Sequence, residues 1–258
     1  ISPPPFSFGL MHMFRRCFLH TTIAVLLVGC ALTGEPAHYN SDPLESYNRA
    51  MFAFNDVVDK TIFKPAAQAY QAILPDLFIT GVGNFLSNIS YFLVLINDIL
   101  QFKFHQAAVD SSRIVFNTTF GVAGLFDVAS RMELPKHTED FGQTLGYWGI
   151  GEGYYLVLPL LGSNTVRDTF GLIGNFYTNP MTWATDSEAV TWSLWGLDFI
   201  NRRAESLQVE RAFADAQIEP YSFRRSAYLQ MRRNLVYDGN PPKPEPEFEA
   251  DLDKPSLP

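Results

Sequence analysis

The chain has 258 residues, 47% of them hydrophobic and 18% charged, and a net charge of −8 at neutral pH. That length and composition suit one large domain or two small ones with apolar surface left over, and the acidic balance argues against a nucleic-acid-binding protein, which would carry a basic face. Only 15 charged residues fall within the 121 positions from 77 to 197, so this region either builds a large core or presents a surface to lipid.

The first predicted element is an export signal. Met13–Arg16 is a short basic stretch, residues 18–28 form an apolar run, and Leu27-Val28-Gly29-Cys30 closes it. The run is typical of a signal peptide and is too short to span a bilayer, which needs about 20 residues. Its end resembles the lipobox of bacterial lipoproteins, in which the cysteine is lipidated and becomes the mature N-terminus. An ordinary secretory signal with an incidental cysteine is the alternative.

These features divide the N-terminal region in two. Residues 1–29 are expected to be an extension and a signal peptide, and residues 30–41 a tether that is lipidated at Cys30. In enterobacterial lipoproteins an aspartate after the cysteine favours retention in the inner membrane. Ala31 stands there in this chain, so we expect the outer membrane.

Two helices are predicted next. Asp42-Pro43-Leu44-Glu45 combines a capping residue, a proline suited to a first turn and a capping-box spacing. Apolar residues then recur at three- and four-residue steps, which predicts an amphipathic helix; they are Leu44, Tyr47, Met51, Phe54 and Val58. Pro65 is expected to interrupt the pattern, and a second helix to continue to Leu74.

Residues 77–97 contain no charged residue, but glycines, asparagines and serines break their apolar character. We expect a short helix there, buried or half in lipid, and another helix over residues 105–116. The sequence "FGVAGLF" then predicts a tight hairpin that serves as a gate, since two glycines permit more than one backbone shape. Its residues are Phe120, Gly121, Val122, Ala123, Gly124, Leu125 and Phe126. Valine at either glycine is expected to fix one state of a folded protein; a static turn is the alternative.

Residues 141–162 hold six glycines and one proline, which makes regular structure unfavourable through most of the segment. It is either a turn-rich connection packed by aromatics or a backbone shaped for close approach of a ligand or a second chain, such as a channel lining. The spacing favours neither. The candidate residues are Gly142, Thr144, Gly146, Gly149, Gly151, Gly153, Tyr155, Pro159 and Gly162.

The C-terminal part is predicted to form two helices and a tail. Asp186-Ser187 precedes a helix with Val190, Leu194, Leu197, Ala204 and Leu207 on one face, and a last helix covers residues 219–237. Four arginines of that last helix return to roughly one face: Arg224, Arg225, Arg232 and Arg233. They form either a solvated face or a contact for phosphate headgroups or an acidic partner. Residues 239–258 are proline-rich and acidic and are expected to be disordered.

Catalytic motifs are missing from the sequence. Beyond the tether the chain has two histidines, His105 and His137, and no cysteine, so a zinc site is not expected. It also lacks a nucleophile elbow, a dinucleotide fingerprint and a Walker sequence. Glu139-Asp140 could be a catalytic carboxyl pair, but a solvated loop is the favoured interpretation. We therefore expect neither an enzyme nor a bound metal or cofactor.

Four stretches together resemble the MlaA/VacJ family of outer-membrane lipoproteins. They are the lipobox at Cys30, "DPLESYNRAMFAFN" (42–55), "FNTTFGVAGLFDVAS" (116–130) and "FGQTLGYWGIGEGYYLVLPLLGSNTVRD" (141–168). The resemblance covers most of the chain from Asp42 to Tyr237 and is looser over residues 77–94.

The resemblance implies an all-α fold over residues 42–238: a ring of amphipathic and hydrophobic helices embedded in one membrane leaflet around a channel, with a glycine-rich irregular segment. It also implies a function. The family removes phospholipids misplaced in the outer leaflet of the outer membrane and passes them to a periplasmic lipid carrier, in association with a porin trimer and without a cofactor. The alternatives are a lipid-anchored adaptor that binds porins without moving lipid, and a lipoprotein phospholipase.

Overall fold

The computed structural model describes residues 42–183, 185–213 and 219–242. The predicted signal peptide, Cys30, the tether up to residue 41 and residues 243–258 of the predicted tail lie outside the described residues. Those expectations stay predictions.

The first described element is a long helical arc with one π-helical turn. α2 (Glu45–Val58) continues into the π-helix η1 (Asp59–Phe63) and then into α3 (Lys64–Ile73). The expected interruption at Pro65 is wrong, because the proline lies in the first turn of α3 and the helix continues. A π turn changes the backbone pairing just ahead of the proline, which has no N–H to donate, so the helix absorbs it.

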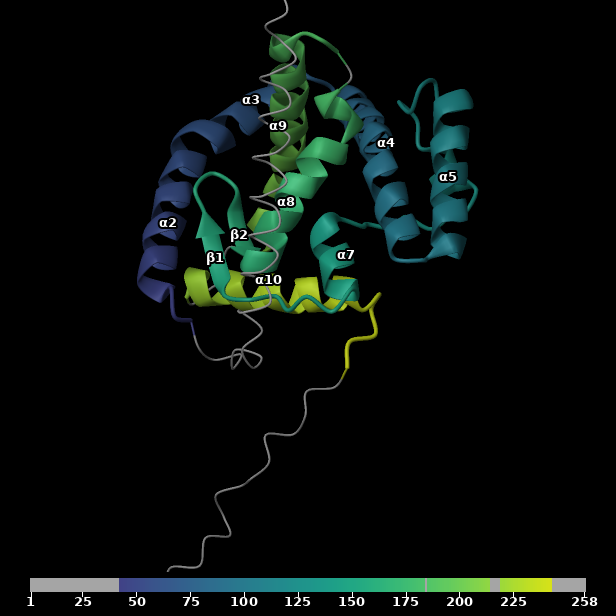
Figure 1. Cartoon of the computed structure of the whole chain (residues 1–258). Helices are drawn as coiled ribbons and strands as arrows, with labels where there is room; N and C mark the ends of the chain where they lie inside the picture. The colour runs from purple at the N-terminus through teal and green to yellow at the C-terminus, as the bar shows by residue number, and fades with distance from the viewer. Residues whose placement is uncertain (1–41, 184, 214–218, 243–258) are drawn as a thin grey trace, which may run out of the picture.

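α4 (Asp76–Leu100) and α5 (Phe104–Thr119) form an antiparallel pair on one side of the molecule (Figure 1). α4 is one unbroken helix of 25 residues, so the short helix expected over residues 77–97 is wrong in length. Its interior contains no proline, and its buried asparagines find partners in neighbouring elements, so the polar residues do not end it. Among the described residues it is the one helix long and apolar enough to cross a membrane.

The glycine-rich segment is more regular than its composition predicts. After the short α6 (Val128–Arg131), it contains α7 (Phe141–Tyr147) and an antiparallel hairpin of β1 (Tyr155–Leu158) and β2 (Gly162–Thr165). Tyr155 pairs with Thr165 across the hairpin and Leu158 with Gly162. Only residues 148–154 and the hairpin turn are irregular. The strand was missed because its sequence, YLVL, shows no alternation of apolar and polar residues.

The two predicted C-terminal helices are present, whereas the helix before them was not predicted. This helix, α8 (Val166–Thr178), leads through the 3-10 turn η2 (Pro180–Thr182) to the two predicted ones, α9 (Glu188–Phe213) and α10 (Pro220–Val236). Figure 1 shows α8 and α9 between the α2–α3 arc and α4, with α10 lying across the foot of the molecule beneath the hairpin and α7. α3 packs on α9 and α7 packs on α8. The hairpin is the one sheet among the described residues, which are mostly helical, as the all-α expectation required.

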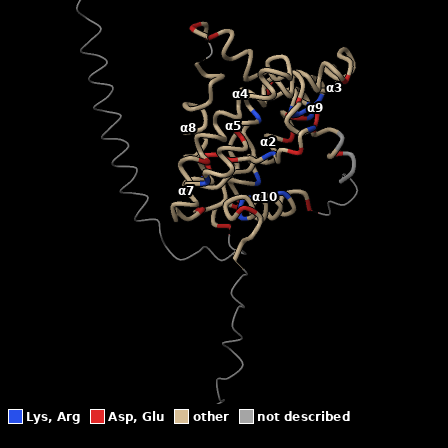
Figure 2. The backbone as a smooth tube through the Cα atoms, turned by 90° about the vertical axis from the view of Figure 1, so that its right-hand side faces the viewer, with Lys and Arg blue, Asp and Glu red and all other residues tan. Residues whose placement is uncertain are grey.

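The described residues bury polar side chains and expose apolar ones. Twenty polar or charged residues are buried against 15 apolar ones, whereas the interior of a soluble domain is dominated by apolar residues. The apolar stripe predicted on the first helix is divided between surface and interior: Tyr47 and Phe54 are exposed, whereas Met51 packs against the core. Asn48, between the two exposed residues, is buried. Figure 2 shows long uncharged stretches along α4 and α8, with charged residues gathered near α7, α10 and the α3–α9 contact.

Candidate functional site

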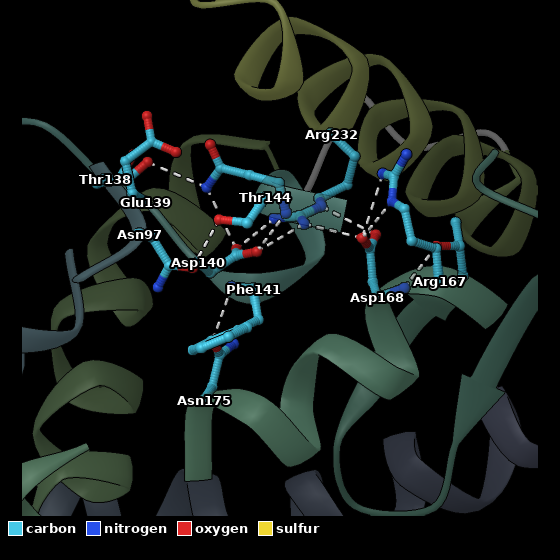
Figure 3. Close-up of polar contacts among 12 residues, drawn as sticks. Asn97, Thr138, Glu139, Asp140, Phe141, Thr144, Arg167, Asp168, Asn175 and Arg232 are labelled. Atoms are coloured by element: carbon cyan, nitrogen blue, oxygen red, sulfur yellow. Dashed lines mark hydrogen bonds and ion pairs between the residues drawn. The ribbon is translucent and has the colours of Figure 1, made fainter. Parts of the chain in front are cut away.

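A buried ion network joins α7, α8 and α10 (Figure 3). Arg232 of α10 binds Asp140 through both terminal nitrogens, with N–O distances of 2.6 and 3.0 Å. The same guanidinium binds Asp168 through Nε and Nη2, both at 2.9 Å. Asp168 also accepts hydrogen bonds from Arg167 and from the Tyr228 hydroxyl, the latter at 2.8 Å. One arginine thus fixes two helix N-termini against α10.

The network holds its carboxylates ionised. Burial alone would raise the pKa of Asp140, but the hydrogen bonds and positive charge of Arg232 outweigh it and hold this pKa below the usual range. Burial also raises the pKa of Asp168, and the charge and hydrogen bonds of Arg232 again outweigh it, so this pKa is lowered as well. Asp140 caps α7 by accepting from the Gln143 N–H at 2.9 Å, and Thr165 caps α8. Asp140 therefore has both a charged and a capping role, whereas at α8 the two roles fall on Asp168 and Thr165.

The first three candidate channel residues serve this packing. A Cβ on Gly142 would lie 2.5 Å from Asp168 Oδ1 and 2.6 Å from Arg232 Nη2. Thr144 is fully buried and donates to Asn97 Oδ1 at 2.7 Å. A Cβ on Gly146 would meet Arg167 and Val236 at 3.0 Å. The groups that approach these positions belong to the chain's own helices, and the approach of a ligand or a second chain stays a prediction.

The remaining glycines of the segment lie in more open surroundings. A Cβ would meet nothing within 4 Å at Gly149, Gly151 or Gly162, and Gly149 and Gly162 have left-handed φ angles of +87° and +77°. At Gly153, φ is +68° and Val166 lies 3.0 Å from the Cβ position. Pro159 is exposed at the hairpin turn, whereas Tyr155 is buried.

Two asparagines of α2 hold the hairpin, and sequence reasoning missed both. Asn48 donates to the carbonyl of Tyr155 at 3.0 Å and accepts from the N–H of Val157 at 2.8 Å. One heptad later, Asn55 donates to the Leu158 carbonyl at 2.8 Å and accepts from the Leu160 N–H at 2.7 Å. Their side-chain amides thus pair with the free edge of β1 as a neighbouring strand would. Two asparagines seven residues apart on a largely apolar helix were the signal.

The predicted gate, residues 120–126, is a run of tight turns after α5. Its backbone is left-handed at Val122, Ala123 and Gly124, with φ of +54°, +56° and +94°. Asn84 of α4 donates to the Leu125 carbonyl at 3.2 Å, and Asn88 donates to the Thr118 hydroxyl at 2.9 Å. Asn84 therefore ties the loop itself to α4, whereas Asn88 ties the last turn of α5 to α4.

The expectation that valine at Gly121 leaves the fold intact is wrong. A Cβ there would lie 2.1 Å from the Phe126 carbonyl oxygen and 2.4 Å from that of Asn117, so the turn itself would have to open. At Gly124 the Cβ would meet Asn88 at 2.7 Å, which displaces the loop from α4 instead.

The four arginines of α10 do not act as one face. Eight helical residues turn the side chain by about 800°, which leaves roughly 80° between the pairs. Arg232 is buried in the ion network, so neither a solvated face nor a headgroup contact describes it. Arg224 is exposed over the Phe52 ring, 5.5 Å from its centroid. Arg225 lies 3.6 Å from Asp42, and Arg233 donates to the Pro242 carbonyl at 2.8 Å.

Glu139 is buried and Asp140 is half-buried, so the solvated loop is wrong, but the two carboxylates do not form one site. Asp140 turns to Arg232, whereas Glu139 binds Lys103 at 2.9 Å and Gln101 at 2.8 Å. His137 contacts Asp110. Within the described ranges, no group of three or more histidines, cysteines and carboxylates is arranged to hold a metal ion.

Comparison with known proteins gives one consistent result. Residues 40–235 match the family model described as MlaA lipoprotein. A relative from Escherichia coli K12, the intermembrane phospholipid transport system lipoprotein MlaA, is 37% identical over 225 residues, covering 85% of this chain and 88% of its own. An uncharacterised protein of Rickettsia prowazekii is 36% identical and covers 80% and 82%.

A solved structure also matches. It comes from work on the structural basis for maintenance of bacterial outer membrane lipid asymmetry, is 31% identical, and superposes with a TM-score of 0.67. The match covers 78% of this chain and all of the other.

Proposed function

This chain belongs to the MlaA lipoprotein family, and we propose that it removes mislocalised phospholipids from the outer leaflet of the outer membrane and passes them to a periplasmic carrier. The relatives named for intermembrane phospholipid transport support the substrate class. The solved structure from work on outer membrane lipid asymmetry supports the membrane. The activity needs no catalytic group, since a phospholipid moves without a covalent step.

The reversed burial pattern is the observation that carries this proposal. Large apolar side chains lie exposed along the helices, and they include Val57, Ile62, Phe78, Ile173 and Trp192. Polar side chains such as Asn48, Asn97 and Thr144 are fully buried. Lipid chains would cover the exposed apolar surface, while a phospholipid headgroup needs a polar route through the body. A ring of helices in one leaflet around a channel satisfies both requirements.

We infer a route along the open part of the glycine-rich segment. Gly149, Gly151 and Gly162 offer backbone without side chains or close neighbours, and irregular backbone at membrane depth is tolerated where it borders a water-filled cavity. The loop 120–126 would be the gate. It exposes Phe120, Val122 and Phe126 and is tied to α4 by the Asn84 amide, which can exchange its partner.

The anchor and the protein partners belong to the same proposal. Cys30 would carry the lipid and hold the body at the periplasmic face of the outer membrane. A porin trimer would give access to the outer leaflet, and a soluble lipid carrier would receive the phospholipid.

The test is complementation of a strain that lacks its own copy of this protein. We expect the wild-type chain to lower the amount of phospholipid in the outer leaflet, measured by surface labelling of headgroups, and Cys30→Ser to fail because it is neither lipidated nor processed. Normal porin binding with no change in outer-leaflet phospholipid would overturn the proposal and leave an adaptor. Fatty acid released from phospholipid by the purified protein would indicate a phospholipase.

A further inference from the structure

Two buried carboxyl groups meet where α4 packs against α5. Asp98 lies in the last turn of α4, Asp110 lies in the second turn of α5, and both are fully buried. Neither carboxyl oxygen of Asp98 has a hydrogen-bond partner among the described residues, and the Asp110 carboxyl is the side chain that interacts with it most strongly. A buried carboxylate without partners is costly, so this placement calls for a physical reason.

The neighbouring cations do not balance two carboxylates. His137, from the segment between α6 and α7, places Nδ1 3.1 and 3.0 Å from the two oxygens of Asp110, and it can carry at most one positive charge. Lys103, in the α4–α5 turn, is already bound to Glu139 at 2.9 Å and to Asp238. One carboxylate of the pair would therefore remain uncompensated if both were ionised.

Other groups near Asp98 add to this imbalance. Arg113, one turn beyond Asp110 on α5, directs its guanidinium to Asp127 and to the Ser130 hydroxyl. Asp98 itself sits at the C-terminal end of α4, where the unpaired carbonyl groups of the helix disfavour negative charge. The negative charge of Glu139 acts on it as well.

We propose that Asp98 and Asp110 form a proton-binding site, in which one proton shared at neutral pH latches α4 to α5 and to the segment that carries His137. Loss of the proton leaves two adjacent buried carboxylates that repel each other. The latch would then loosen α5, which leads directly into the loop 120–126. This inference is independent of the proposed function.

The electrostatics agree with the geometry. Burial, the interaction with the Asp110 carboxyl and the negative charge of Glu139 raise the pKa of Asp98 well above the usual range, and Lys103 opposes them only in part. A shared metal ion is a weaker explanation, because the described residues provide no three-group metal arrangement.

The sign of the pH effect follows from proton binding. An aspartate in the unfolded chain has a pKa of about 3.9, so above that pH the folded state holds a proton that the unfolded state has released. Stability should therefore fall as the pH rises, with the unfolding equilibrium constant increasing by up to about tenfold per pH unit. Asp98→Asn is neutral at every pH and should remove this dependence.

Infrared spectroscopy of the whole protein in detergent tests the site directly. We expect a carbonyl band from a protonated carboxylic acid at pH 7 that disappears on alkaline titration and is absent from Asp98→Asn. Asp76→Asn, which changes an exposed carboxylate at the other end of α4, is the matched control and should keep the band.

A second measurement compares the pH dependence of unfolding in wild type and Asp98→Asn. In the wild-type protein the unfolding equilibrium constant should rise by up to about tenfold per pH unit because of this one proton, and the variant should lack this rise. An identical slope, or no band at pH 7 that Asp98→Asn removes, would overturn the proposal. If that variant does not accumulate, the titration of the wild-type band decides: a band that titrates supports the site, and its absence overturns it.

Discussion

At the scale of single residues, Arg232 has the largest predicted effect. Among the described residues, Arg232 is the one cation that pairs with Asp140. Asp168 pairs with Arg232 and with one further cation, Arg167. Arg232→Gln removes the charge but leaves both carboxylates in place. Because breaking a buried ion pair from one side strands a charge, we expect a loss of about 3 kcal/mol or more in the free energy of unfolding. Thermal melting in detergent and abundance in membranes measure it.

The neighbouring arginine is the matched control. Arg233→Gln changes an exposed side chain whose described bond goes to a backbone carbonyl, and surface changes of this kind usually stay within about 0.5 kcal/mol. If Arg232→Gln melts at the same temperature as Arg233→Gln, the network does not hold the three helices together.

The same network predicts sensitivity to acid. Asp140 and Asp168 have lowered pKa values in the folded protein, so their stabilisation is fully present above the unfolded value of about 3.9 and is lost as the pH falls below it. The melting temperature of the wild-type protein should fall as the pH is lowered below about 4. The melting temperature of Arg232→Gln should fall less over the same range. Parallel pH curves for the two proteins would exclude the network as the source.

At the scale of elements, the hairpin depends on two side chains of α2. Asn48→Ala would leave the Val157 N–H and the Tyr155 carbonyl without their partner, at a cost of about 1 to 3 kcal/mol. Hydrogen exchange should report it first, as faster exchange of the Val157 amide. Ser46→Ala, an exposed change on the same helix, should leave that amide protected. Equal protection in both variants would show that packing alone holds the hairpin.

The loop 120–126 offers a test of gating without unfolding. Gly124→Ala places a Cβ 2.7 Å from Asn88 at a backbone φ of +94°, so we expect the loop to move away from α4 while the helices stay intact. Outer-leaflet phospholipid should then change at normal protein abundance. Gly81→Ala, whose Cβ meets the same loop only at 3.7 Å, is the control. Wild-type phospholipid levels in Gly124→Ala would make the loop a static turn.

At the scale of the whole molecule, sequence periodicity located the helices but not the direction they face. The predicted stripe lies along one helix, yet Tyr47 and Phe54 are exposed while Met51 packs against the core. Periodicity marks an apolar face without saying whether protein or lipid covers it. The bounds of α5 and α10 were predicted to within a few residues, whereas α8 was not predicted.

The site was harder to predict because it is built from distant contacts. Arg232 lies 92 residues from Asp140 and 64 from Asp168, and no local pattern connects them. Glu139, which is buried, and Asp140, which is half-buried, were interpreted as a solvated loop, since burial depends on neighbours that the sequence does not place. Gly142 was singled out for close approach, but only the structure identifies the approaching groups as Asp168 and Arg232.

The exposed apolar surface makes a prediction about the body as a whole. We expect Cys30→Ser, although it lacks the lipid, to stay with the membrane fraction through a high-salt wash, because buried methylene groups contribute about 0.8 kcal/mol each. Full release into the soluble fraction would show that the lipid alone holds the protein at the membrane.

The central claim is that this protein moves phospholipid and is not only an adaptor that binds porins. The most direct test places purified full-length protein in vesicles with labelled phospholipid and measures the label acquired by a purified periplasmic lipid carrier. We predict that phospholipid co-purifies with the protein. We also predict that loading of the carrier depends on the protein, so that vesicles without the protein load no carrier. Carrier loading at the rate seen with protein-free vesicles, although the protein in the vesicles is folded, would contradict the account.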